Sequence, residues 1–196
     1  MMNYPVMYRL GLTPWERYGL RSREQIAGIL GQENPQSNGR ALDIGCGRGK
    51  FTTLLAANGW DATGIDMVPG AIDAARQGDS NGAHFIVGDA TELSSYELGT
   101  FDLFVDIGCF QGFTSSQRSR MGGGVTSLAN PGARLLMLAF GPSRYQGSIG
   151  GVSRRDIAEA FPQWTITHVE AAPLAGLGWP MNRTFPQWYR LEFAQL

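Results

Sequence analysis

The sequence predicts an α/β protein in which helices cover both faces of a mostly parallel sheet, that is, a three-layer α/β/α sandwich. Short apolar runs alternate with helical patterns from residue 40 to residue 140, and this alternation is typical of βαβ units. The first apolar run leads into a glycine-rich turn, as in parallel sheets that bind ligands beyond their carboxyl ends. Beyond residue 140, two apolar runs follow with no helix between them, which predicts an antiparallel pair at the sheet edge.

The length and composition are those of one globular domain. A chain of 196 residues, 43% hydrophobic and 17% charged, can bury a core and is too apolar to be disordered. We therefore predict a single domain over 1–196, with a helical N-terminal lid segment over 1–39 and a core over 40–196. The formal net charge of −1 gives no long-range attraction to polyanions, so neither nucleic acid nor an acidic membrane surface is expected as a partner.

The sequence also bears on location and on metals. The N-terminus lacks the basic and apolar regions of a signal peptide, and the longest apolar run, 135–140, is too short to span a bilayer. We therefore expect a cytoplasmic protein. Cys46 and Cys109 are the only cysteines, which predicts free thiols and no disulfide framework. No spacing of His, Cys and Asp residues indicates a metal site, and the oligomeric state leaves no signal in the sequence.

The expected elements follow in chain order. Capping boxes at 13–16 and 22–25 predict helices before the first strand, the second of them ending near Gly31. Apolar runs predict strands at 41–44, 61–65, 84–87, 101–105 and 133–140, the last introduced by a turn at 130–132. Helical spacing predicts helices at 50–58, 69–76 and 115–129.

Two parts of this assignment are unusual. One helix contains residues that disfavour helix, and the alternation of strands and helices ends after residue 140. The helix at 115–129 contains three consecutive glycines at 122–124, each costing about 1 kcal/mol relative to alanine. After residue 140, Ser153 caps a short helix that ends at Pro162. Strands are then predicted at 164–169 and 189–193, joined by a long loop over 173–186.

The strongest functional signal is the turn after the first strand. Gly45, Gly47 and Gly49 stand at alternate positions between that strand and the next helix. Glycine lets the backbone turn sharply and approach a ligand closely. The dinucleotide pattern G-x-G-x-x-G would need its third glycine at Lys50, so this spacing argues against a nicotinamide or flavin dinucleotide. The alternative is that the turn uses glycine only for its own geometry.

Acidic residues follow the next strands in the same way. Asp66 ends the second strand, 17 positions after Gly49, where a carboxylate can accept both hydroxyls of a ribose. Asp89 follows the third strand, where an aspartate can receive the amine of an adenine. Asp106 follows the fourth strand. The alternatives are a solvated loop acid for Asp66 and a helix cap or turn acid for Asp89.

From about residue 40 to residue 196, these motifs together resemble the class I S-adenosylmethionine-dependent methyltransferases. The resemblance implies a Rossmann-like, seven-stranded sheet of order 3-2-1-4-5-7-6, with strand 7 antiparallel. It implies S-adenosyl-L-methionine as cofactor, with its methionine part lined by Asp43, Gly45, Cys46, Gly47 and Gly49. It further implies that Asp66 binds the ribose, that Met67 lies against the adenine ring, and that Asp89 and Ala90 lie at the adenine edge. Asp106 is expected to contact the cofactor.

Within the class, the segment from Asp106 to Phe110 resembles the D-x-G-x-F step of the thiopurine and tellurite-resistance groups. Those groups often carry histidine at the next position, whereas this chain has Gln111, which removes one candidate base. Enzymes that methylate amines of nucleic acids usually show an Asn/Asp-Pro-Pro-aromatic step here, and this chain has no such proline. We therefore predict methyl transfer to an O, N or S atom of a small aromatic or heterocyclic molecule. The alternatives are a protein or nucleic-acid acceptor, or a protein that binds the cofactor without catalysis.

The acceptor is expected to lie among three loop segments, 4–18, 141–152 and 173–185. The side chains predicted to bind it are Trp15, Phe110, Arg144, Tyr145 and Trp179. The alternative is that these aromatic residues only anchor loops. Methyl transfer depends on alignment and on exclusion of water more than on an acid or base, so no catalytic residue is predicted.

Overall fold

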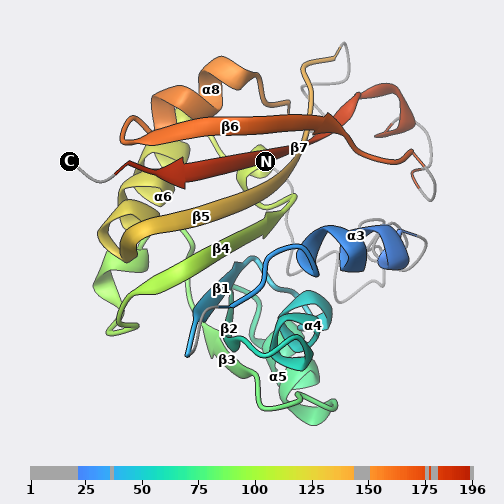
Figure 1. Cartoon of the computed structure of the whole chain (residues 1–196), viewed down its shortest axis with the longest axis vertical. Helices are drawn as coiled ribbons and strands as arrows, with labels where there is room; N and C mark the ends of the chain where they lie inside the picture. Colours follow the sequence, from blue (N-terminus) through green and yellow to red (C-terminus); the bar gives the residue numbers. More distant parts are fainter. Residues whose placement is uncertain (1–21, 36–37, 144–150, 175–176, 178–180, 195–196) are drawn as a thin grey trace.

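The computed structural model describes residues 22–35, 38–143, 151–174, 177 and 181–194. Its centre is a seven-stranded sheet of order β3-β2-β1-β4-β5-β7-β6, in which β7 runs antiparallel to both of its neighbours (Figure 1). The strands are β1 Arg40–Ile44, β2 Asp61–Asp66, β3 His84–Val87, β4 Phe101–Ile107, β5 Ala129–Phe140, β6 Trp164–Ala171 and β7 Pro186–Phe193. The predicted fold class and strand order are confirmed.

Helices cover both faces of this sheet. The helices are α3 Arg23–Leu30, α4 Lys50–Ala57, α5 Pro69–Gln77, α6 Ser115–Ser127 and α8 Arg154–Ala160. Short 3-10 turns are η1 Leu93–Ser95, η2 Phe110–Gly112 and η3 Met181–Arg183. Helices α3, α4 and α5 share one apolar core with the sheet, and α6 and α8 share the other, on the opposite face (Figure 1).

Alternation along the strands supplies these two cores. In β5, Leu135 and Met137 belong to the core under α6 and α8, whereas Leu136 and Leu138 belong to the core under α3, α4 and α5. Because successive side chains of a strand point to opposite faces, an almost continuous apolar run is what a strand covered on both faces requires. Among the described residues, no helix is both long and apolar enough to cross a membrane.

The glycine-containing helix α6 forms, which confirms that prediction, and its glycines have a packing reason. A side chain at Gly122 would overlap the backbone carbonyl of Ala160 in α8, and one at Gly124 would stand 2.9 Å from Cβ of Leu93. Both glycines therefore let neighbouring elements approach closely. At Gly123 nothing lies within 4 Å of an added Cβ, so that glycine has no such reason.

Three local expectations need correction. The fifth strand begins at Ala129, four residues earlier than predicted, because the expected turn at 130–132 lies inside it as an irregularity in the pairing with β4. Ser22 precedes α3 but makes no side-chain capping hydrogen bond, so the second predicted capping box does not form. The first, at 13–16, lies outside the described residues. Ser153 and Asp156 do form a capping box at the start of α8.

The last two strands pair antiparallel as predicted, although only one of them lies at the edge. β7 is inserted between β5 and β6, so that β6 is the edge strand. Since β7 runs against the other strands, it begins where they end. The carboxyl edge of the sheet is therefore bounded by the ends of six strands and by the beginning of β7 at Pro186.

Candidate functional site

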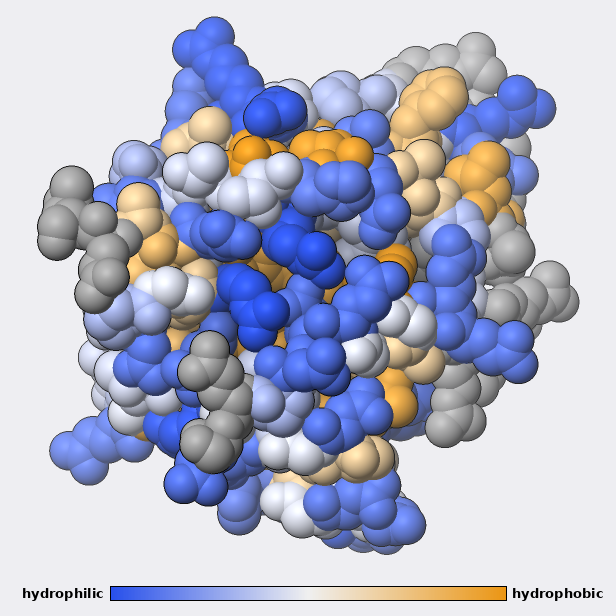
Figure 2. All heavy atoms as spheres, viewed as in Figure 1, coloured by the Kyte–Doolittle hydropathy of each residue, from blue (hydrophilic) through white to orange (hydrophobic). Residues whose placement is uncertain are grey.

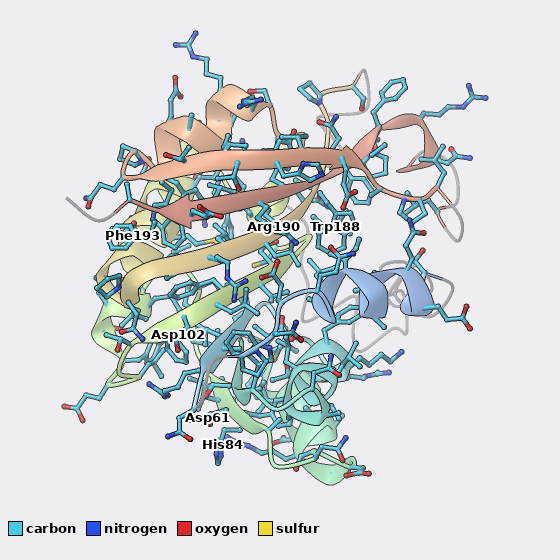
Figure 3. All side chains as sticks on the ribbon, in the orientation of Figure 1. Asp61, His84, Asp102, Trp188, Arg190 and Phe193 are labelled. Carbon is cyan, nitrogen blue, oxygen red and sulfur yellow. The ribbon has the colours of Figure 1, made fainter. Side chains whose placement is uncertain are left out.

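The acids predicted after the strands gather at this carboxyl edge. In the register of the sheet, Ile44 of β1 lies beside Ile65 of β2 and beside Asp106 of β4. Asp43 and Asp66 are one residue from that row on their own strands. Figure 3 shows that Asp61, His84 and Asp102 lie at the opposite, amino edge, at the beginnings of β2, β3 and β4. His84 is therefore far along its strand from the candidate site.

The glycine turn is bound into the fold by its neighbours on both sides. Gly45, Gly47 and Gly49 all have positive φ, +72°, +55° and +75°. A side chain at Gly45 would stand 2.7 Å from Cβ of Cys109, and one at Gly49 would overlap the ring of Phe85. Gly45 is thus required by packing against the loop after β4, and Gly49 by packing against β3, in addition to the left-handed backbone of both.

Asp66 connects the turn to the end of β2. Its Oδ2 accepts a hydrogen bond from the Gly47 N–H, and its Oδ1 accepts one from the Val68 N–H, each at 2.9 Å. Burial raises the pKa of Asp66, and these two hydrogen bonds oppose the rise. The carboxylate is partly exposed. Each carboxylate oxygen offers two lone-pair sites, so both retain capacity toward a ligand.

Asp43 and Asp106 lie deeper. The exposed fraction of Asp43 is 2%, and that of Asp106 is 0%. Asp43 accepts a 2.6 Å hydrogen bond from the Thr52 hydroxyl in α4, while Asp106 accepts one at 2.9 Å from each of the Cys109 and Phe110 N–H groups. Burial raises the pKa of each carboxyl to about 7. These two side chains fix the first turn of α4 and the loop after β4. Both carboxylates are buried, and the cofactor contacts predicted for Asp43 and Asp106 stay predictions.

The residues predicted at the adenine side differ in exposure. Met67 is 52% exposed, directly after β2, whereas Ala90 is 7% exposed. Asp89 is partly exposed, and its Oδ1 accepts a 2.8 Å hydrogen bond from the Thr91 N–H. The Asp89 N–H donates to the Tyr96 hydroxyl at 2.9 Å, which fixes the turn after β3. Met67 and Asp89 can thus offer side chains to a ligand, and Ala90 can offer only its backbone.

Both cysteines are free thiols. Burial raises the pKa of Cys46 and of Cys109, so neither is a thiolate at neutral pH. Cys46 packs under Gly64 of β2, where an added side chain would stand 2.8 Å from its sulfur. Within the described part of the chain, no group of three or more His, Cys, Asp or Glu side chains could hold a metal ion.

Of the residues predicted to bind an acceptor, only Phe110 is described, and its contact with an acceptor stays a prediction. It is fully buried, with its ring 5.7 Å from that of Phe161 and the Arg118 guanidinium 5.2 Å from its centroid. Phe110 is thus a core residue held by contacts that the local motif does not reveal. Trp15, Arg144, Tyr145 and Trp179 lie outside the described residues.

Sequence reasoning missed two charged residues, Arg118 and Glu33, that join separate segments of the fold. Arg118 is 8% exposed and donates to the backbone carbonyls of Phe110, Gln111 and Gly151 at 3.1–3.3 Å, which joins the loop after β4 to the segment before α8. Glu33 is 2% exposed and lies 2.6 Å from both Arg134 of β5 and Arg190 of β7, which fastens the segment after α3 to the sheet. Figure 3 labels Arg190 on β7 beside Trp188.

Gln111, which stands where a histidine base was considered, also has a structural partner. Its Oε1 accepts a 3.0 Å hydrogen bond from the Phe140 N–H at the end of β5. This bond ties the loop after β4 to the end of β5. The sequence offered no signal for these contacts, because the partners of Glu33 and Gln111 lie far along the chain and Arg118 also reaches Gly151, 33 positions later.

The comparisons with known proteins agree with this geometry. A family model described as a methyltransferase domain matches residues 41–132. A 2-heptyl-1-hydroxyquinolin-4(1H)-one methyltransferase of Mycobacteroides abscessus is 29% identical over 155 residues, which are 74% of this chain and 67% of that protein. Nodulation protein S of Rhizobium tropici is 35% identical over 141 residues, which are 70% of this chain and 55% of that protein. The matched region is thus only part of each relative.

One solved structure illustrates the shared fold. The N-methyltransferase NodS from Bradyrhizobium japonicum, in complex with S-adenosyl-L-homocysteine, aligns with a TM-score of 0.71 at 19% identity. The alignment covers 89% of this chain and 87% of that one. Strand order, glycine turn and the acid after β2 define a Rossmann-like methyltransferase fold. Residues 41–132 match a methyltransferase domain, and the chain is similar to the class I S-adenosylmethionine-dependent methyltransferases.

Proposed function

We propose that this protein transfers a methyl group from S-adenosyl-L-methionine to an O, N or S atom of a small aromatic or heterocyclic molecule. One observation carries the proposal. Four large hydrophobic side chains are exposed in the described part of the chain, and all four lie at the carboxyl edge of the sheet: Met67, Val87, Leu174 and Phe185. Exposed apolar side chains that gather at one edge mark a ligand site.

These four side chains form two pairs on either side of the glycine turn. Met67 and Val87 follow β2 and end β3, and they border the place proposed for the adenine. Leu174 and Phe185 lie between β6 and β7, and they border the place proposed for the acceptor. The two pairs are separated in the sheet by β1, β4 and β5, where the turn at 45–49 and Asp106 lie. This order supports a cofactor on one side and an apolar acceptor on the other.

The described residues fit S-adenosyl-L-methionine. Asp66 keeps free lone pairs toward a ribose, and the backbone of the turn over Gly45, Gly47 and Gly49 is open to close approach. Met67 offers an exposed apolar surface, and Asp89 a carboxylate, toward the adenine. Asp43, Cys46, Ala90 and Asp106 would support these groups from beneath, since all four are buried.

The cofactor, when bound, supplies the methyl group on a positively charged sulfonium. Three acids, Asp43, Asp66 and Asp106, lie at this edge; burial raises the pKa of each, to about 7 for Asp43 and Asp106, and a nearby cation would favour their ionised forms. The task of the remaining residues is to hold the acceptor in line and to exclude water. Thiolate and phenolate acceptors need no protein base, which is consistent with Gln111 being bound to the Phe140 backbone.

The acceptor class has two further supports. One relative is named for a hydroxyquinolinone acceptor, a flat heterocycle. The net charge of −1 gives no field for a polyanion, and on the face shown in Figure 2 apolar groups are small and separated by hydrophilic surface. Neither feature favours a nucleic acid or a broad protein surface as acceptor.

The test is a turnover screen with S-adenosyl-L-methionine and four acceptor classes: phenols, thiols, heterocyclic amines and 1-hydroxyquinolin-4-ones. We expect S-adenosyl-L-homocysteine to form together with a methylated product for at least one of them. A protein that binds the cofactor and releases no S-adenosyl-L-homocysteine with any acceptor is a binding protein. Turnover only with a protein or with nucleic acid contradicts the proposed acceptor class.

A further inference from the structure

Phe185 combines an unfavourable backbone with an exposed aromatic ring. Among the described residues, three that are not glycine have positive φ: Asn38 at +63°, Asn81 at +47° and Phe185 at +48°. Asparagine adopts this left-handed conformation readily, whereas a bulky aromatic residue does so at a cost. The following residue is Pro186, which restricts Phe185 further.

The chain on both sides holds Phe185 in place. Pro186 pairs with Phe140 in the sheet, and the Gly141 N–H donates to the Phe185 carbonyl at 3.4 Å. Thr184, before it, is fully buried. A side chain at Gly141 would stand 3.2 Å from the carbonyl oxygens of both Thr184 and Phe185, so the two segments are closely packed.

The unfavourable backbone of Phe185 is not compensated by burial of its side chain. Its exposed fraction is 74%, the highest among the large hydrophobic side chains described. A strained residue persists only where its surroundings impose it, and such residues concentrate at functional sites. The ring stands at the carboxyl edge, where β5 ends and β7 begins. Leu174, 51% exposed, lies in the same β6–β7 connection.

We infer that Phe185 is a specificity-determining residue that contacts the methyl acceptor and selects a planar apolar one. This inference rests on the proposed function. The ring and the Leu174 side chain are both exposed in the β6–β7 connection, and a flat heterocycle that covers them removes apolar surface from water and packs against an aromatic face. The packed backbone on both sides fixes the direction in which the Phe185 side chain leaves the chain before the acceptor arrives, which reduces the entropy lost on binding.

The inference makes two opposite predictions for one substitution. In Phe185→Asn, the ring is lost and the backbone conformation becomes a favourable one. We expect KM for an aromatic acceptor to rise about tenfold. We also expect Tm to stay level or to rise by about 2–4 °C. The Kd for S-adenosyl-L-homocysteine should not change, because Phe185 is on the acceptor side.

Asn81→Phe is the reciprocal control. Asn81 has almost the same φ, is exposed, and lies before β3 at the amino edge. Placing an aromatic ring there should lower Tm, which shows the cost of the conformation, and should leave KM unchanged. Phe185→Leu keeps an apolar side chain but no ring and should give an intermediate KM.

The outcomes separate this inference from the proposed function. If the wild-type protein methylates an aromatic acceptor and Phe185→Asn has the wild-type KM, the inference is wrong and the proposed function stands. If Phe185→Asn lowers Tm and impairs cofactor binding as well, Phe185 is structural. If the wild-type protein turns over only acceptors without a planar ring, both the acceptor class and the inference are overturned.

Discussion

Replacing Asp66 by asparagine tests the centre of the proposed cofactor site. The carboxylate accepts hydrogen bonds from the N–H groups of Gly47 and Val68, each at 2.9 Å. An asparagine side chain has one carbonyl oxygen and one amide NH2 group. It can therefore satisfy only one of these N–H groups and presents a donor to the other. A cofactor ribose loses a charged acceptor at the same time.

The size of the effect follows from these contacts. A hydrogen bond to a charged group contributes about 1.5–3 kcal/mol, and the partial exposure of Asp66 places it at the lower end. Since about 1.4 kcal/mol corresponds to a tenfold change in Kd, we expect Asp66→Asn to weaken S-adenosyl-L-homocysteine binding at least about tenfold. The change in Tm should be small, because burial raises the pKa of Asp66 and a neutral side chain avoids that desolvation cost.

Isothermal titration calorimetry with S-adenosyl-L-homocysteine, and thermal unfolding in parallel, measure both effects. Asp61→Asn is the matched control, at the other end of β2, where the carboxylate lies 3.2 Å from Arg40 in a partly exposed pair. Such pairs contribute about 0–1 kcal/mol, and the control should bind with the wild-type Kd. A wild-type Kd for Asp66→Asn would refute the assignment of Asp66 to the ribose.

Three further predictions concern stability. Gly123→Ala should raise the free energy of unfolding by about 0.5–1 kcal/mol, because an added Cβ has space there. Gly122→Ala should lower the free energy of unfolding, because an added Cβ overlaps Ala160 of α8. Equal effects of the two substitutions in urea unfolding would contradict this packing. Glu33→Gln should cost about 3–5 kcal/mol, because it leaves Arg134 and Arg190 without their anionic partner, whereas Glu24→Gln, at an exposed position of α3, should cost little. Equal changes in Tm for the two variants would rule out the Glu33 ion pairs as an anchor. Asp43→Asn should flatten the pH profile of Tm. Burial raises the pKa of Asp43 from 3.8 to about 7, so the contribution of protonated Asp43 to stability is full below pH 3.8 and is lost as pH rises through 7. A profile that the substitution leaves unchanged would exclude this titration.

The sheet was predictable because its signals are local. The strands of the parallel part are short apolar runs bounded by turns, and the order of helices and strands limits the topology. The irregularity at 130–132 shows where local signals fail: Asn-Pro-Gly predicts a turn, and Gly132 has the expected positive φ of +75°, yet pairing with β4 continues on both sides. Tertiary hydrogen bonds there override the turn preference.

The sequence predicts where the candidate site residues lie in the sheet, but not which way their side chains point. The spacing of Gly45, Asp66 and Asp106 places them at one edge, as the register confirms. Whether a side chain points outward or inward depends on partners elsewhere in the chain. Phe110 is buried because Phe161, some fifty positions later, and Arg118 pack against it, and the D-x-G-x-F step contains no information about either.

The three acids at the carboxyl edge, Asp43, Asp66 and Asp106, have two different roles: two of them are buried and hold the protein together, and one is also open to a ligand. Asp43 and Asp106 spend their hydrogen-bonding capacity on the protein, on the Thr52 hydroxyl and on the loop after β4, and burial brings the pKa of each to about 7. Asp66 joins the turn to β2 while keeping part of its surface open. A cationic ligand beside this edge favours the ionised form of all three, so the same burial that is unfavourable for the free protein is partly compensated when a sulfonium is bound. A neutral thioether offers no such compensation. We therefore expect the three acids to favour a ligand that carries a sulfonium over the same ligand with a neutral thioether sulfur.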